Sequence, residues 1–477
     1  MIKAALAVFL IVFGACSQPA ATQTIALVGA TVIDGTGGAP LDNAVVLIEG
    51  DRLTCVGIAE ACPVPSGVEP VDLSGRFITP GLVDAHVHFS QTGWLDGRPD
   101  GLSAPDLYPY AETAKTLRAN PHRWHRSYLC SGITAVYDVG GHPWTTSLPA
   151  QADADPTAAH VRAAGPLITH ASVPALNIDE EIYTFLPMST PEEVQASVGK
   201  LVAMGSTAAK VWYLRPSENR REMLDARLME IGAAAEAAGL DLIVHATSLR
   251  EAKAALKAGA KLLVHSVSDV VVDDEFLSLM AANQTIYAPT LVVGANWGQA
   301  MASVIRNTPH SIDDPNGCVD PNTVEKVNNT EGMQSYLPER LRNPEAATQS
   351  AERRAARSEA QLEIMAENLR RVHNAGLIVA TATDAGNPLT LHGPSIYNEM
   401  EAMQEAGLSA SAIIVTATRN GAEAMGRLAD FGTLEPGKIA DLIVLSEDPQ
   451  RDVRAFRSLT HVMRAGVLYP QEELGYR

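Results

Sequence analysis

The sequence predicts an α/β fold in which a (β/α)8 TIM barrel is joined to a small β-sandwich domain built from both ends of the chain. Two observations predict it. Between residues 78 and 430, short runs rich in Ala, Val and Leu alternate with helix-like stretches, as in parallel strands with crossover helices. Residues 24–77 and 431–477 instead consist of short apolar runs between Gly and Pro turns, which is typical of β-hairpins.

Eight apolar runs account for the expected barrel strands. They are ITPGLVDAHVHF, ITAVYDVG, HVRAAGPLIT, TAAKVWY, LDLIVHAT, AKLLVHSV, TIYAPTLVV and GLIVATATDAG. Between them lie helical segments such as PEEVQASVGKLVAMG and REMLDARLMEIGAAAEAAG, each of which ends in glycine as helices often do. The connection from Gly294 to Arg354 is far longer than an ordinary barrel loop, so it is either a lid or a poorly ordered insertion, and we favour a lid.

Residues 1–20 have the features of an export signal. Lys3 precedes a short apolar stretch, and small residues lead into Cys16. The segment FGAC resembles a bacterial lipobox, so we expect Cys16 to be lipidated, with plain cleavage near Ala20 as the alternative. The apolar stretch is too short to span a bilayer as a helix. We therefore expect an exported protein of the bacterial cell envelope or periplasm, anchored by lipid, in which Cys55 and Cys62 can form a disulfide bond.

The charge balance restricts the classes of partner. The chain has 36 Lys and Arg against 55 Asp and Glu, a formal net charge of −19, which disfavours nucleic acids and anionic lipid surfaces. Contact with a membrane is therefore expected only through the lipid anchor. The five cysteines contain no CxxC pair, so a thiolate zinc cluster is not expected either. A small-molecule substrate remains as the expected partner, and a homo-oligomer is compatible with the sequence.

Alternation along the first predicted strand turns one set of side chains toward the barrel axis. The inward set is Asp84, His86 and His88, and the outward set is Val83, Ala85 and Val87. Two imidazoles at alternate positions share one side of a strand, which suits a metal site.

The same alternation places polar residues at the ends of four further strands. Lys210, His245, His265 and Asp384 are the inward residues, and Ala209, Val211, Leu242, Val244, Leu262 and Val264 are the outward ones. Catalytic residues of such barrels lie at the C-terminal ends of the strands. Six polar residues on five strands are therefore predicted to converge on one rim as a catalytic or metal site.

These residues carry a resemblance to a known family. The motifs TPGLVDAHVHF, AAKVWY, IVHATS, LVHSVS, ATDAG and GTLEPGKIADLIVLSEDP resemble the amidohydrolase superfamily, and in particular its imidazolonepropionase-like branch, which includes metal-dependent Xaa-Pro dipeptidases. The resemblance implies a binuclear site: one divalent metal bound by His86, His88 and Asp384, a second bound by His245 and His265, and Lys210, carboxylated by CO2, as the bridge.

Electrostatics gives an independent reason for modifying the lysine. A protonated ammonium would be repelled by two neighbouring dications, whereas a carbamate on Lys210 is an anionic oxygen ligand that both metals can share. The alternative is a free Lys210 cation paired with Asp384, which leaves a mononuclear site or none. Imidazole and carboxylate ligands suit Zn²⁺ most often, while Mn, Co and Fe are also compatible.

The predicted function is a metal-dependent hydrolase that cleaves carbon–nitrogen bonds of dipeptide-like, N-acyl or cyclic amide substrates through a metal-bound hydroxide. Asp384 is the expected general base and acid. His142 and Tyr213 are expected to help polarise the carbonyl, and His170 and His392, on rim loops, to contact substrate. Two alternatives remain open: a lactonase, esterase or phosphotriesterase using the same site, and a non-catalytic envelope lipoprotein that binds a ligand.

Overall fold

The computed structural model describes residues 24–476. The predicted export signal and its lipidation site, Cys16, lie outside these residues. Within the described range, no helix combines the length and the apolar character needed to cross a membrane.

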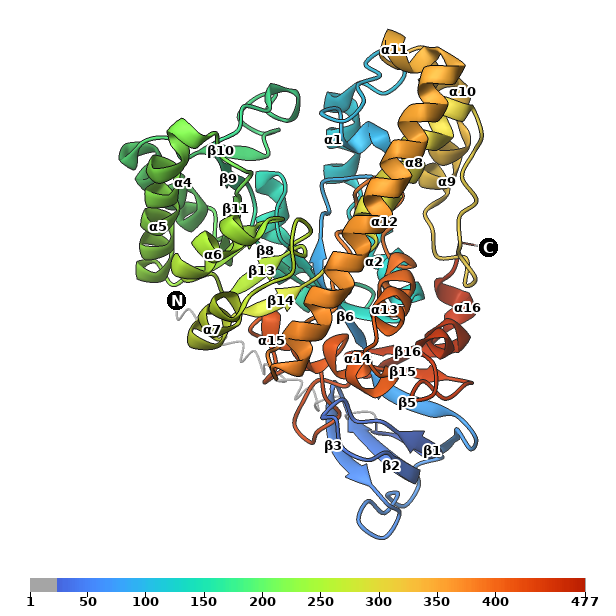
Figure 1. Ribbon diagram of the computed structural model, residues 1–477. Coiled ribbons are helices and arrows are strands. Elements are labelled where there is room, and N and C mark those ends of the chain that lie inside the picture. Colours follow the sequence, from blue (N-terminus) through green and yellow to red (C-terminus); the bar gives the residue numbers. More distant parts are fainter. Residues whose placement is uncertain (1–23, 477) are drawn as a thin grey trace, which may run out of the picture.

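The two ends of the chain form one sheet (Figure 1). Its strands are β1 (Thr24–Val32), β2 (Leu41–Glu49), β3 (Arg52–Gly57), β4 (Val71–Asp72), β5 (Phe77–Pro80), β15 (Leu442–Leu445), β16 (Leu459–Arg464) and β17 (Val467–Pro470). They are ordered β17-β16-β15-β5-β1-β2-β3, with β4 beside β1. The antiparallel pairing of β5 with β15, with Ile78 opposite Val444, joins the N-terminal part to the C-terminal part. The second layer of a sandwich stays a prediction.

Parallel strands occupy the middle of the chain and form two further sheets. One has the order β10-β9-β11-β12-β13-β14, and the other has the order β6-β7-β8. Their bounds are β6 (Leu82–Val87), β7 (Ile133–Asp138), β8 (His160–Ala163), β9 (Leu167–Thr169), β10 (Phe185–Pro187), β11 (Ala208–Trp212), β12 (Asp241–His245), β13 (Leu262–Val264) and β14 (Ile286–Ala288).

Hydrogen bonds connect the two parallel sheets on both sides. The segment 378–385 lies between β14 and β6, because Ala380 N donates to Tyr287 O at 2.9 Å and Ala85 N donates to Thr381 O at 3.0 Å. On the other side, Thr207 N donates to Ala163 O at 2.9 Å, from the start of β11 to β8. The fold is thus a mixed α/β fold, and closure into a regular eight-stranded barrel stays a prediction.

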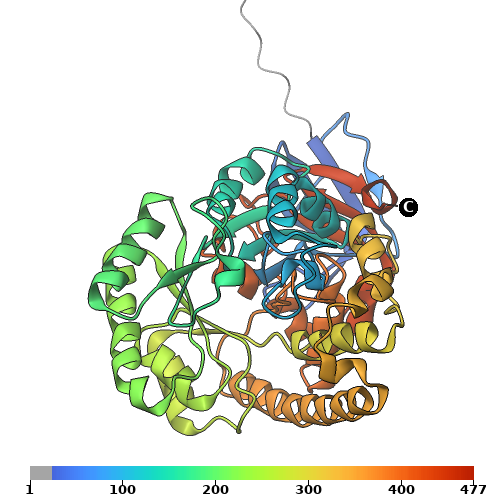
Figure 2. The ribbon, with the colours of Figure 1, turned by 90° about the horizontal axis from the view of Figure 1, so that it is seen from above.

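The described chain has sixteen α helices, many of which surround the parallel strands (Figure 2). They are α1 (Tyr110–Ala119), α2 (His122–Cys130), α3 (Leu148–Asp153), α4 (Pro191–Ala203), α5 (Arg221–Ala237), α6 (Leu249–Lys257), α7 (Asp274–Asn283), α8 (Val293–Arg306), α9 (Pro321–Asn328), α10 (Thr330–Gln334), α11 (Glu339–Arg342), α12 (Pro344–Asn374), α13 (Ser395–Glu405), α14 (Ala410–Thr416), α15 (Arg419–Ala424) and α16 (Gln471–Leu474). Helices α4 and α5 lie where the sequence predicted helical segments. Each is followed by a glycine with positive φ, Gly205 after α4 and Gly239 after α5.

Two predicted strands differ from the structure, and the predicted long connection, whose role as a lid stays a prediction, is largely helical. The run HVRAAGPLIT is divided into β8 and β9, because Gly165 has a φ of 68° and turns the chain between them. The run GLIVATATDAG contributes isolated bridges through Val379 and Ala385 instead of a continuous strand. The connection 294–354 is largely helical, from α8 through the first part of α12.

Strict alternation also misplaces five side chains, four apolar ones and Asp84. Ala209, Val211, Leu242 and Val244 pack in the outer core with helix residues such as Leu228, as predicted. However, Val83, Ala85, Leu262 and Val264, predicted to face outward, belong to the inner cluster with Ala208 and Ile243. The register of β6 shifts against β7 between Asp84 and Val87, which inserts an extra residue before the histidines. A φ of 72° likewise breaks the alternation at His265.

Two disulfide bonds are present in the described chain. The predicted bond between Cys55 and Cys62 is confirmed. A second, which the sequence analysis did not predict, joins Cys130 at the end of α2 to Cys318 before α9, two residues separated by 188 positions. This bond attaches the long connection to the end of α2, directly before β7.

We expect removal of the Cys130–Cys318 bond to destabilise the protein more than removal of the Cys55–Cys62 bond. Loop-closure entropy assigns about 5 kcal/mol to the long loop and about 2 kcal/mol to the short one. Urea denaturation of the Cys130→Ala/Cys318→Ala and Cys55→Ala/Cys62→Ala proteins, without reductant, measures both shifts. Equal shifts would contradict this assignment.

Candidate functional site

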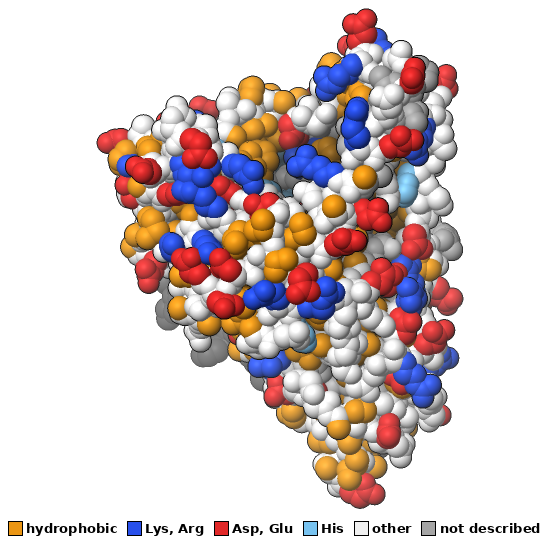
Figure 3. All heavy atoms as spheres, in the orientation of Figure 1, with side chains coloured by type: hydrophobic (Ala, Val, Ile, Leu, Met, Phe, Trp, Pro, Cys, Tyr) orange, Lys and Arg blue, Asp and Glu red, His pale blue; other side chains and the backbone are white. Residues whose placement is uncertain are grey.

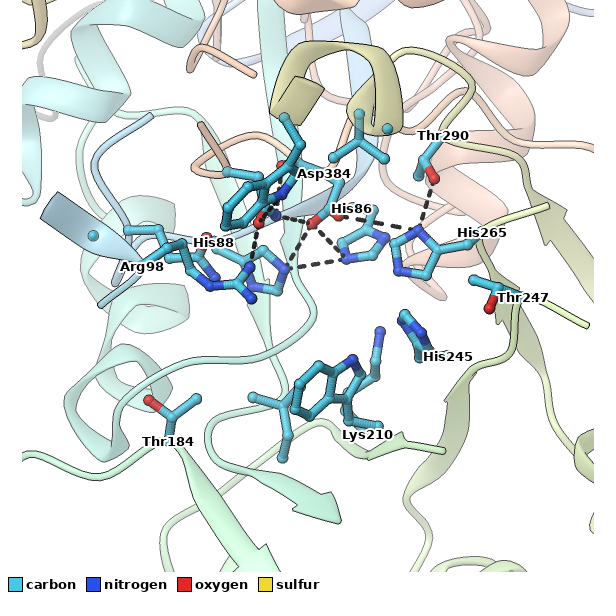
Figure 4. Close-up of a pocket in the computed structure, with 18 of the residues that line it drawn as sticks. His86, His88, Arg98, Thr184, Lys210, His245, Thr247, His265, Thr290 and Asp384 are labelled. Carbon is cyan, nitrogen blue, oxygen red and sulfur yellow. Dashed lines mark hydrogen bonds and ion pairs between the residues drawn. The ribbon is translucent and has the colours of Figure 1, made fainter. Parts of the chain in front are cut away.

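A cavity of about 310 Å³ lies at the ends of the parallel strands, and all six predicted rim residues border it. They are His86, His88, Lys210, His245, His265 and Asp384 (Figure 4). Side chains from β9, β10, α8 and α12 form other walls, and in Figure 3 the surface is hollowed between these elements. The structure therefore brings together residues from five separate parts of the sequence.

The first group of ligand atoms is closely packed. The Nε2 atoms of His86 and His88 are 3.2 Å apart, and Asp384 Oδ1 lies 3.2 Å from the first and 2.9 Å from the second. All three side chains are buried, and their donor atoms lie within the spacing that one metal ion allows. Two imidazoles and a carboxylate form a donor set that suits a divalent transition metal.

Hydrogen bonds on the far side of two imidazoles orient them. His88 Nδ1 donates to Gly140 O at 2.5 Å, which leaves its Nε2 lone pair directed at Asp384 and the centre. His265 Nδ1 lies 2.7 Å from Thr290 Oγ1. The buried Nδ1 of His86 has no hydrogen-bond partner among the described residues. These arrangements fit imidazoles that act as neutral ligands.

The second group lies beside the first. The ring centroids of His245 and His265 are 4.4 Å apart, and those of His86 and His265 are 5.0 Å apart. The side chain of Lys210 points into the same space from β11 (Figure 4). Among ion pairs of the described residues, Asp384 pairs with histidines and none joins it to Lys210.

Burial keeps the site largely uncharged. It lowers the pKa of His245 to about 3 and the pKa values of His86 and His265 well below their usual range, with Lys210 adding to the effect. Burial also lowers the pKa of Lys210 to about 7, and the Asp384 charge opposes this shift. Neutral imidazoles and a partly deprotonated amine have lone pairs available for metal ions or for CO2.

Asp84 joins the strand of His86 to the segment of Asp384. Its Oδ2 accepts from Thr383 Oγ1 at 2.6 Å, and its Oδ1 accepts from Thr383 N at 3.0 Å. Asp384 N also donates to His86 O at 2.8 Å. Burial raises the pKa of Asp84 to about 7. Asp84 thus holds two segments of the site together, and its predicted inward position is wrong, because its strand neighbours Val83 and Ala85 are the residues of the inner cluster.

Four residues with predicted catalytic or substrate-binding roles do not border this cavity. His142 Nε2 is 3.1 Å from the hydroxyl of Tyr110, which itself borders the cavity. The hydroxyl of Tyr213 donates to Asp225 Oδ1 at 2.5 Å, in a second cavity. Their predicted roles require an action through neighbours or a movement of the chain.

The side chains of the two residues predicted to contact substrate also form hydrogen bonds within the protein. His170 Nε2 donates to Leu214 O at 3.0 Å. His392 stacks on Trp124, with ring centroids 3.8 Å apart, and its Nε2 donates to His88 O at 3.0 Å. His392 therefore supports the backbone of a ligand histidine, and substrate contact by His170 and His392 stays a prediction.

Sequence reasoning missed three polar residues of the cavity. Asn387 Nδ2 donates to Asp384 Oδ1 at 2.7 Å, while Asn387 Oδ1 accepts from Arg98 and, at 3.2 Å, from Trp297 Nε1. The guanidinium of Arg98 lies 5.0 Å from the centre of the Trp297 ring. For Asn387, the only sequence signal was its position three residues after Asp384. Arg98 and Trp297 had no such signal, because they come from segments without strand periodicity.

The amidohydrolase family model matches residues 77–468. The chain belongs to this family. It is 25% identical over 440 residues to an imidazolonepropionase of Caulobacter vibrioides, a match that covers 87% of this chain and 90% of that protein. A shorter match, 35% identical over 71 residues, to a 5-methylthioadenosine/S-adenosylhomocysteine deaminase of Symbiobacterium thermophilum covers 15% of this chain and 16% of that protein.

Solved structures share the fold of this amidohydrolase. A Xaa-Pro dipeptidase with bound methionine matches with a TM-score of 0.69 and 21% identity, over 94% of this chain and 100% of that one. A molinate hydrolase matches with a TM-score of 0.66 and 21% identity, over 95% and 96% of the two chains. The predicted family is thus confirmed, and the protein is a hydrolase that acts on carbon–nitrogen bonds. The family is metal-dependent, in agreement with the His-His-Asp cluster.

We expect Asn387→Ala to weaken metal binding by about 10- to 100-fold, because such outer hydrogen bonds orient a ligand carboxylate. Competition with a chromophoric chelator measures the dissociation constant. Asn420→Ala is the matched control, since Asn420 donates to Val379 O at 2.8 Å on the same segment without touching Asp384. Equal affinities of the Asn387→Ala and native proteins would show that Asp384 needs no such support.

Proposed function

We propose that this amidohydrolase uses two divalent metal ions to cleave amide bonds of dipeptide-like, N-acyl or cyclic amide substrates. Zn²⁺ is the metal that we propose. One observation carries the proposal: four histidines, a lysine and an aspartate converge on one buried cavity. In this proposal His86, His88 and Asp384 hold the first metal, and His245 and His265 hold the second. A (β/α)8 barrel is the proposed frame that holds them.

The bound metals would supply an activated water as nucleophile and would polarise the substrate carbonyl. The protein supplies the orientation of both partners. His88 is fixed through Gly140 O, and Asp384 is fixed through Asn387, so the donor set needs little rearrangement. Hydrolysis adds water across the amide: a C–O bond forms, the C–N bond breaks, and the nitrogen leaves with a proton.

Asp384 is the residue proposed to carry that proton. Its Oδ1 already contacts both His86 and His88, whereas Oδ2 lies 4.0 Å from His265 Nδ1 and is the freer oxygen. Oδ2 can therefore take the proton of the attacking water and transfer it to the leaving nitrogen. His142 and Tyr213 would assist indirectly, through Tyr110 and through the second cavity.

Carboxylation of Lys210 completes the proposed centre. The side chain is 2% exposed, and its burial favours the uncharged amine. A neutral amine can add to CO2 and lose a proton, and the carbamate of Lys210 would then supply anionic oxygen ligands for the metals. A free Lys210 cation would instead repel both metals.

The cellular location and the partners of the enzyme are proposed from the sequence. We infer export to the bacterial envelope or periplasm with lipid attachment at Cys16, contact with membranes only through this anchor, and no nucleic-acid partner at a net charge of −19. A small-molecule amide is the inferred partner. The two disulfide bonds support an oxidising compartment.

We expect Asp384→Asn to lower kcat for amide hydrolysis by about 10²- to 10⁴-fold, because the amide cannot accept the proton. Turnover of Xaa-Pro dipeptides, N-acyl amino acids, cyclic amides, lactones and aryl phosphotriesters by the metal-loaded protein identifies the reaction. Asp274→Asn, at an exposed position of α7, is the control. Turnover of lactones or phosphotriesters but no amide would contradict the proposal, and no turnover at all would favour a ligand-binding role.

Metal loading should depend on pH and bicarbonate through Lys210. Below pH 7 the amine is protonated and has no lone pair for CO2, whereas above pH 7 it is neutral. Metal-free protein given Zn²⁺ and bicarbonate should therefore bind close to two ions at pH 8 and about one at pH 6. The Lys210→Ala protein should show no bicarbonate effect, and a native protein without one would refute the carbamate.

A further inference from the structure

A third cavity, distinct from the one that Tyr213 borders, continues the active-site cavity along α8 and α12. Its volume is about 410 Å³, and Gly294, Gln361 and Met365 border both cavities. The two helices contact each other, and Figure 1 shows α12 along the front of the molecule with α8 beside it. This third cavity, which we call the groove, therefore begins at the catalytic centre.

The α8 side of the groove is made of small residues. Gly294, Gly298 and Ala302 are four positions apart, which places them on one face of the helix. A Cβ atom added at Gly294 or Gly298 would meet no other atom within 4 Å. This face of α8 thus leaves open space where a helix normally packs against its neighbour.

The remaining wall is mainly apolar. Leu362 and Met365 from α12 and Ile305 from α8 border the groove, and Leu362 is 41% exposed, which is unusual for a large apolar side chain. The charged residues Arg306 and Glu359 border the groove but not the active-site cavity. The groove is therefore suited to an aliphatic ligand that enters from the catalytic centre.

We propose that the groove binds the aliphatic acyl chain of an N-acyl substrate, an inference that rests on the proposed amide hydrolysis. With the amide carbonyl at the metal centre, the chain extends along α8. From Gly294 to Ile305 the helix advances about 16 Å, long enough for a medium or long chain. Water then adds to the carbonyl carbon, the C–N bond breaks, and a fatty-acid carboxylate and a protonated amine are released.

The test compares N-acetyl, N-octanoyl and N-lauroyl derivatives of one amino acid with the metal-loaded full-length protein. We expect kcat/KM to rise by at least about tenfold from acetyl to lauroyl. Gly298→Leu and Ala302→Leu fill the groove and should remove this rise while leaving the acetyl derivative unaffected. Gly199→Leu on α4, where an added Cβ likewise meets nothing within 4 Å, is the matched control.

A binding measurement separates this inference from the proposed function. Calorimetry of lauric acid binding should show at least about tenfold weaker affinity in Gly298→Leu and Ala302→Leu than in the native and Gly199→Leu proteins. Such a loss without hydrolysis of any amide would support the groove and refute the proposed function. Hydrolysis without chain-length preference and with unchanged binding would overturn the groove alone. A change of oligomeric state in both groove variants, measured by light scattering, would identify an interface instead and also overturn it.

Discussion

The site depends on one contact between segments that are 299 residues apart, that of Asp84 with Thr383. The Asp84 carboxylate accepts both the hydroxyl and the backbone N–H of Thr383, and Asp384 N donates to the carbonyl of His86. These bonds place the Asp384 carboxylate beside His86 and His88. They are buried, so water cannot replace them, and breaking them would leave unsatisfied polar groups. The contact also fixes the segment 378–385 between β14 and β6, and thereby joins the two parallel sheets.

The same burial determines the chemistry available at the site. Removed from water, the imidazoles of His86, His245 and His265 are held neutral, and the Lys210 amine loses much of its proton affinity. A cluster of neutral nitrogen donors around one carboxylate has little net charge of its own. Divalent ions would therefore be the largest charges in the cavity, and the net charge of the whole chain has little bearing on it.

The sequence predicted which residues meet at the cavity better than it predicted the backbone that carries them. Histidine, lysine and aspartate at the ends of apolar runs were sufficient to select six residues that border one cavity, because the C-terminal ends of parallel strands meet at one rim. Alternation failed for Val83, Ala85, Leu262 and Val264, since a register shift in β6 and a positive φ at His265 change which face a residue presents. Asn387, Arg98 and the Cys130–Cys318 bond could not be predicted, because the contacts of Arg98 with Asn387 and of Cys130 with Cys318 join segments far apart in the sequence, and no periodic pattern specifies that these segments meet.

Asn387 joins α8, in the helical connection 294–354, to the site around Asp384. It orients Asp384 through its amide nitrogen, and its amide oxygen accepts from Trp297 on α8 and from Arg98. Trp297 precedes Gly298, so the helix that forms one wall of the groove also supplies a hydrogen bond to the residue that contacts Asp384. The ligands come from the ends of the parallel strands, while the groove comes from α8 and α12. Substitutions in the groove can thus change substrate choice without moving the ligands, provided that the Trp297–Asn387 bond is kept.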